Sequence, residues 1–166
     1  MKEVVEFANR YYHDKALLRH VELVREYSLK LAEIENCDKK VVEIAAILHD
    51  IGKSECREGH SHRSYEMSRE FVESMDLSDE QKRLVLKCIL KHSSRFSDEE
   101  NEIEVKVIQS ADALAVLFDD EWQEYSRKSM EKDILKGLYD KTYSKINIDS
   151  ARNIAKQQIE RLMSLL

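Results

Sequence analysis

The amino-acid sequence predicts an all-α protein, built as one bundle of about seven to eight helices. Two observations lead to this prediction. The 166 residues include no proline and only three glycines, whereas an average chain carries about 5% and 7% of these residues, so the usual markers of strands and turns are nearly missing. Apolar residues also recur at spacings of three and four along most of the chain, which is the period of a helix with one buried face.

The first half of the chain contains five expected helices. Helical spacing of apolar residues predicts three of them, at residues 2–12, 16–35 and 39–50, and a fourth is expected at residues 61–75. Between the third and the fourth lies the loop IGKSECREGH, residues 51–60, which holds two of the three glycines and is expected to form the rim of a pocket. Ser78 with Gln81 then matches a capping box, which predicts a fifth helix that runs to about His92.

The second half begins with a polar stretch at residues 93–102, which is expected to be a loop. An apolar pattern from Ile103 onward predicts a largely buried helix, and acidic and aromatic segments continue to about Tyr139. A last helix is expected at residues 149–165, with Asp149 as its N-cap. The aromatic segment at residues 118–128 is expected either to line a pocket or to form a homodimer contact, and both roles stay open.

Composition excludes several classes of protein. The net charge of −6 and the pI near 5.6 argue against general binding of nucleic acid or of anionic membranes. No apolar run approaches the roughly 20 residues that span a bilayer, and the first 15 residues are too charged for a secretory signal. We therefore expect a cytoplasmic protein with no membrane partner, and its length favours a single domain over residues 1–166.

The most informative run is VVEIAAILHDIGK, residues 41–53, because an apolar helix ends in adjacent His49 and Asp50 just before a glycine. Imidazole and carboxylate ligands together suit Mn, Fe, Co, Ni or Zn better than Ca or Mg alone. The alternative is structural: Asp50 would then interact with the following loop, and His49 would be a core histidine with satisfied hydrogen bonds.

This run resembles the HD superfamily of metal-dependent phosphohydrolases, whose signature is an upstream His, the His-Asp doublet and a downstream Asp, all on helices. The matching positions are His20, His49, Asp50 and Asp112. The resemblance covers roughly residues 16–118 and implies an HD-type bundle with this core, on which helices of residues 119–166 pack. A surface or core histidine at position 20 and a buried acid paired with a base at position 112 are the alternatives.

Two further histidines resemble ligands of the binuclear branch of this superfamily. They are His60, at the start of the fourth expected helix, and His92, at the end of the fifth. The resemblance implies one ion held by His20, His49, Asp50 and Asp112, and a second held by His60 and His92, with Asp50 bridging. His62 competes with His60 for this role, and His92 has the alternative role of a helix C-cap. The cofactor is thus expected to be one or two divalent transition-metal ions, with Mg as an alternative.

Lys53 matches the lysine of the HDIGK form of the motif and is expected to contact a phosphate oxygen, with a solvated loop lysine as the alternative. Arg57, Arg63 and Arg95 flank the same loops and are further candidates for phosphate binding. The sequence lacks both the Gly-Tyr-Pro motif of the cyclic-dinucleotide branch and the catalytic glutamate that other branches place where Lys53 stands, so those substrates lose support.

The resemblance implies hydrolysis of a phosphomonoester or phosphoanhydride on a phosphorylated small molecule, most simply a nucleotide. A metal-activated water would be the nucleophile, and Asp50 and Lys53 are the candidate catalytic residues. Two alternatives are kept: a non-catalytic sensor module that binds metal or nucleotide, and a binuclear-iron oxygenase on the same fold.

Overall fold

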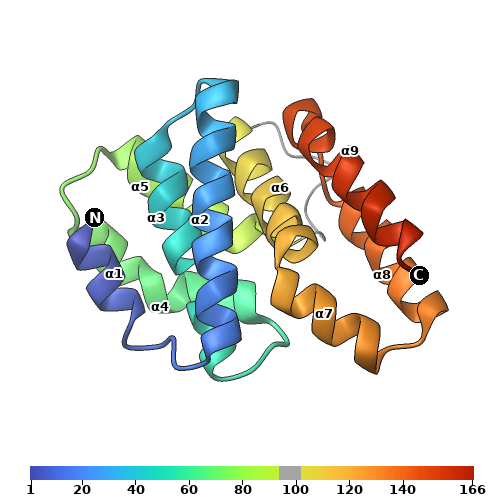
Figure 1. Cartoon of the computed structure of the whole chain (residues 1–166). Coiled ribbons are helices and arrows are strands. Elements are labelled where there is room, and N and C mark those ends of the chain that lie inside the picture. Colours follow the sequence, from blue (N-terminus) through green and yellow to red (C-terminus); the bar gives the residue numbers. More distant parts are fainter. Residues whose placement is uncertain (94–101) are drawn as a thin grey trace.

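The computed structural model describes residues 1–93 and 102–166, and the all-α prediction is confirmed (Figure 1). Within these ranges the chain forms nine α-helices, one 3₁₀ helix and no strand. In chain order they are α1 (Lys2–Ala8), α2 (Lys15–Glu35), α3 (Lys39–Leu48), η1 (Ile51–Ser54), α4 (His60–Ser74), α5 (Asp79–Lys91), α6 (Ile103–Phe118), α7 (Asp120–Ser129), α8 (Lys132–Ser144) and α9 (Asp149–Ser164).

The number of helices exceeds the predicted seven to eight because the acidic and aromatic segment, for which no helix bounds were predicted, forms two helices. Met130 and Glu131 both adopt extended backbone angles between α7 and α8, so the helical hydrogen bonds start afresh at Lys132. Most of the loop predicted at residues 93–102, including Arg95, lies outside the described residues.

Helices α3 and α6 form the centre of the core. Every residue of α3 from Val41 to Leu48 is buried except Glu43, and α6 is buried on nearly all sides, as expected for helices that are apolar all round. Helix α2 packs against both of them, α5 covers the other side of α3, and α8 and α9 pack on α6 (Figure 1). The two most buried helices are therefore the ones that carry the His49-Asp50 doublet and Asp112.

Local capping explains where several helices begin. The Asp38 side chain accepts hydrogen bonds from the first backbone N–H groups of α3, and Ser78 and Gln81 form the predicted capping box at α5. The prediction for the last helix is wrong by one residue, since Ile148 is the N-cap and Asp149 begins α9. Asp149 still lies in the first turn, where the helix dipole favours an acid.

Segment 118–128, for which two roles were open, starts beside the turn of α2 that carries His20. The guanidinium of Arg19 pairs with Asp119 at 2.8 Å and with Glu121 at 2.6 Å, while Tyr125 further along α7 is exposed. The described helices include none whose length and apolar character would let it cross a membrane.

Candidate metal centre

Five helices bring the six predicted metal ligands together at one place. His49 and Asp50 follow the last turn of α3, and His92 follows the last turn of α5. His20 lies in the second turn of α2, His60 starts α4, and Asp112 lies in the middle of α6. Residues separated by up to 92 positions in the chain thus meet around a single buried carboxylate, that of Asp50.

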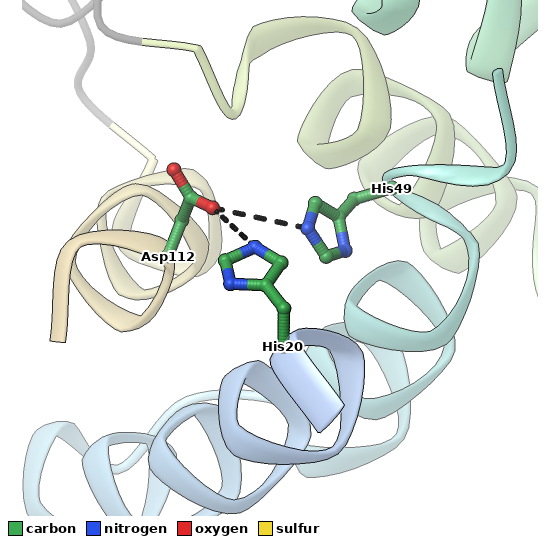
Figure 2. Close-up of side chains that lie close together, drawn as sticks. All are labelled: His20, His49 and Asp112. Atoms are coloured by element: carbon green, nitrogen blue, oxygen red, sulfur yellow. Dashed lines mark hydrogen bonds and ion pairs between the residues drawn. The ribbon is translucent and has the colours of Figure 1, made fainter. Parts of the chain in front are cut away.

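The first group consists of His20, His49 and Asp112 (Figure 2). The Asp112 Oδ1 atom lies 3.0 Å from His20 Nε2 and 3.9 Å from His49 Nε2. Asp50 Oδ2 lies 3.5 Å from the same atom of His20 and 3.2 Å from that of His49. Two imidazole nitrogens and two carboxylate oxygens therefore face one small volume.

The second group lies on the other side of Asp50. Its Oδ1 atom is 3.3 Å from His60 Nε2 and 3.4 Å from His92 Nε2, and these two nitrogens are 3.0 Å apart. Asp50 thus presents one oxygen to each group. The competitor His62 is 74% exposed and lies near Glu66 on the solvent side of α4, so the structure places His60, and not His62, in the cluster.

Three of the histidines are oriented in the same way by the backbone. The Nδ1 atoms of His49, His60 and His92 each lie 2.7–2.8 Å from the carbonyl oxygen three residues earlier in the chain. A carbonyl only accepts hydrogen bonds, so Nδ1 carries a proton, and whenever the ring is neutral its lone pair is on Nε2. Metal-binding histidines in proteins are commonly fixed by such a bond to the other ring nitrogen.

The centre contains buried polar atoms that the described residues leave unsatisfied. The side chains of His49 and Asp50 are fully buried, yet His49 Nε2 and Asp50 Oδ1 make no hydrogen bond of normal geometry with any described residue. Leaving a charged acceptor in this condition is costly, because burial removes its water without replacing it. A divalent cation between the two groups would satisfy these atoms, so the residues present fit such an ion.

The protonation states also suit a cation. Burial alone would raise the pKa values of Asp50 and Asp112, but the neighbouring histidines outweigh it and hold both well below their usual range. Burial lowers the pKa of His49, and it lowers that of His60 to about 4. Burial would lower the pKa of His92 as well, but its hydrogen bond and charge interaction with Asp50 outweigh burial and raise that pKa. At neutral pH the centre therefore offers ionised carboxylates and the neutral imidazoles of His49 and His60, which are the forms that bind metals.

Lys53 lies against Asp50 rather than in solvent. Its ammonium group is 2.5 Å from Asp50 Oδ2, and its side chain is 23% exposed. It comes from η1, whose Gly52 approaches α4 so closely that a Cβ atom there would lie 2.6 Å from the His60 carbonyl oxygen and 2.7 Å from the Ser64 backbone nitrogen. Glycine at position 52 is therefore what allows Lys53 and His60 to lie together.

Arg63, a sequence candidate for phosphate binding, is used by the loop instead. Its guanidinium donates to the carbonyl groups of Gly52, Cys56 and Glu58 and pairs with Glu55. These contacts fix the shape of the loop that carries Lys53. The guanidinium is thus engaged on several sides without any phosphate.

Sequence reasoning missed Tyr12, which supports the doublet from outside the motif. Its hydroxyl donates to the Ile47 carbonyl oxygen at 2.8 Å, and the side chain is buried. Burial and the nearby Asp50 carboxylate raise the pKa of this hydroxyl well above its usual value, so it stays a donor. Tyr12 follows another tyrosine in a segment with no recognisable motif, and no local signal marks it.

Comparison with known proteins identifies a family and two structures of similar fold. The family model described as the HD domain matches residues 17–117, more than half of the chain. Two crystal structures have the same fold with a TM-score of 0.72 and 19% sequence identity over 99% of this chain. One is a predicted HD superfamily hydrolase from an uncultured Thermotogales bacterium, of which 88% is covered, and the other is YpgQ from Bacillus subtilis, of which 90% is covered.

Proposed function

The chain belongs to the HD domain family, and from this premise we propose that it is a metal-dependent phosphohydrolase. It cleaves a phosphomonoester or phosphoanhydride of a nucleotide-like small molecule through a metal-activated water. The observation that carries the proposal is the position of Asp50, which presents one carboxylate oxygen to each of two groups of imidazole nitrogens.

The donor set defines the cofactor. His20, His49, Asp50 and Asp112 would hold one ion, and His60, His92 and Asp50 would hold a second. Nitrogen and carboxylate oxygen donors favour Mn, Fe, Co, Ni or Zn, with Mg as an alternative. Such ions would supply a water of lowered pKa as nucleophile and would polarise a phosphoryl oxygen.

The protein groups around the ions divide the remaining work. The backbone carbonyls behind His49, His60 and His92 keep each Nε2 lone pair aimed inward, so the site is organised before substrate arrives. Lys53 turns from Asp50 to a phosphate oxygen of the substrate. Since the whole chain carries a net charge of −6, attraction of an anionic substrate depends on this local positive charge and on the ions.

A pair of histidines on α4 gives a matched test. The purified protein is assayed with Mn for phosphate and pyrophosphate release from a panel of nucleotides, together with His60→Ala and His62→Ala. The wild type turns over at least one nucleotide, His60→Ala loses at least about 100-fold in turnover because an ion ligand is removed, and His62→Ala matches the wild type. Equal activity in all three proteins contradicts the assignment of His60.

The same preparations separate the other functions that the motif allows. Turnover that requires iron and O₂ would assign an oxygenase, and nucleotide binding without turnover under any metal would assign a sensor. Either result overturns the proposed hydrolase.

A further inference from the structure

Two side-chain amides connect the last turn of α5 with the segment between α8 and α9. Asn147 Nδ2 donates to Gln109 Oε1 at 2.6 Å, and Gln109 Nε2 donates to the Lys91 carbonyl oxygen at 2.7 Å. Lys91 ends α5 and directly precedes His92. Gln109 is buried, with 2% of its surface exposed, and Asn147 is half-buried.

In this series of hydrogen bonds, the donor and the acceptor of each bond are fixed by the Lys91 carbonyl at its end. A carbonyl accepts and never donates, so Gln109 must turn its NH₂ group toward Lys91 and its oxygen toward Asn147. Asn147 must then present its own NH₂ group to Gln109, which leaves its Oδ1 to accept from the Ser110 hydroxyl at 3.0 Å. The Ser110 hydroxyl oxygen also accepts from the Asn147 backbone N–H at 3.3 Å. Each bond fixes the orientation of the next.

The link ends beside the second group of candidate ligands. Carbonyl groups in the last turn of a helix need donors from outside that helix, and the end of α5 uses two different ones: the ring of His92 itself bonds to the Ile89 carbonyl oxygen, and Gln109 bonds to that of Lys91. Gln109 also lies three residues before Asp112 on α6. The Gln109 amide therefore links the helix of Asp112 to the turn that holds His92.

We propose that Gln109, oriented by Asn147, is a positioning residue that holds the end of α5 so that His92 Nε2 faces Asp50. The consequence is selective: the link sets the affinity for the second ion, between His60, His92 and Asp50, and leaves the first ion unaffected. This inference rests on the proposed function. Asn147 lies outside the residues matched by the HD domain, so the second half of the centre depends on the C-terminal helices.

The substitution Asn147→Asp tests the direction of the chain with almost no change in shape. The new carboxylate cannot donate, and a bond from the Gln109 NH₂ group to this charged acceptor is stronger than its bond to the Lys91 carbonyl. The Gln109 amide therefore turns and places its oxygen against the Lys91 carbonyl, which repels it. We expect about a 10-fold or larger loss of affinity for the second ion, the usual range for groups that orient ligands, with the affinity for the first ion unchanged. The measurement is a Co²⁺ titration followed by visible absorption and by equilibrium dialysis.

Two further variants separate the positioning role of Gln109 from a general structural effect. Gln109→Met removes the donor at similar volume and gives the same selective loss. Ser110→Ala removes the hydroxyl on the other side of Asn147 without changing the direction of the chain, and it binds both ions as the wild type does. Thermal melting of each variant in EDTA checks that the fold persists.

Wild-type affinity for both ions in Asn147→Asp and Gln109→Met overturns the inference. So does an equal loss of both ions, or the same loss in Ser110→Ala, since a general structural role would produce it. A wild-type protein that binds fewer than two Co²⁺ ions contradicts the binuclear centre itself, and that result is distinguishable because it needs no variant.

Discussion

Helix α3 has a carboxylate at each end, Asp38 before its first turn and Asp50 after its last. Asp38 is half-buried, and its oxygens accept hydrogen bonds from the backbone N–H groups of Lys40 and Val41 and from the Gln81 amide, at 2.8–3.2 Å. Asp50 is fully buried, and its Oδ1 atom has no hydrogen bond of normal geometry among the described residues.

The difference follows from the direction of the helix. An acid before the first turn meets free N–H groups and the positive end of the helix dipole, whereas an acid after the last turn meets carbonyl oxygens and the negative end. The chain itself therefore stabilises Asp38, and Asp50 needs positive charge from elsewhere. Lys53 supplies part of it, and the surrounding imidazoles are arranged to share the rest with a cation. The same residue type is thus structural at one end and suited to metal binding at the other.

Exchanging each of the two acids for its amide should give the largest difference in metal affinity between the two ends of α3. Asp50→Asn removes the charge that both ions share, so we expect metal affinity and turnover to fall by at least about 100-fold. Asp38→Asn keeps the capping oxygen and should leave both at the wild-type level. Metal content by elemental mass spectrometry and nucleotide turnover measure the effect. Retention of metal by Asp50→Asn would contradict the role assigned to this residue.

Metal binding should stabilise the fold, and this gain should depend on the residues at the C-terminal end of α3 and not on Asp38 at its N-terminal end. At a metal concentration 100 times the dissociation constant, the expected gain is about 2.7 kcal/mol, which corresponds to roughly 5–10 °C in Tm for a chain of this size. EDTA should reverse it, Asp38→Ala should keep the full shift, and His49→Ala should lose it. Differential scanning calorimetry with and without Mn measures the shift, and an equal shift in His49→Ala would locate the metal elsewhere.

Removing the cap should give the opposite pattern, a loss of stability without a loss of metal. Asp38→Ala deletes the acceptor for two N–H groups of α3, so we expect unfolding to become easier by about 1 kcal/mol. Urea unfolding in EDTA measures it. Metal affinity should not change, because the centre lies at the far end of the helix. A loss of metal in this variant would mean that the two ends are not independent.

The smallest expected effect concerns pH. Burial alone would raise the pKa of Asp38, but hydrogen bonds from Gln81, Val41 and Lys40 outweigh it, so the pKa is lowered. A carboxyl with a lower pKa in the folded chain stabilises the fold above its unfolded value of about 3.9, and the contribution is lost as the pH falls through the folded pKa. The stability of wild type relative to Asp38→Asn should therefore shrink below about pH 4. A difference that stays constant down to pH 2 would refute this.

Features of the fold and of the candidate site that depend on local sequence patterns could be predicted from the sequence. Helical spacing located the apolar helices, the doublet before Gly52 marked the end of α3, and the register of the following helix favoured His60 over His62. Their roles as ligands stay predictions, although the structure gathers all six candidates around Asp50.

Contacts between distant residues could not be predicted in this way. Tyr12 supports Ile47 across 35 positions, and Asn147 reaches Gln109 across 38. A hydroxyl or an amide in a helical pattern carries no sign of such a partner, since only the packing of α1 on α3 and of the C-terminal helices on α6 brings the groups together. The bounds of α7 and α8 were not predicted for a different reason, because neither proline nor glycine marks the end of α7 at Met130.

X-ray diffraction from crystals grown with Mn²⁺ or Co²⁺, recorded at the absorption edge of the metal, tests the central claim most directly. The expected anomalous map has two peaks on either side of Asp50, one among His20, His49 and Asp112 and the other between His60 and His92. The protein used for the crystals is first shown to bind metal in solution. If the map then has no peak at this end of α3, the assignment of this cluster as the metal centre is contradicted.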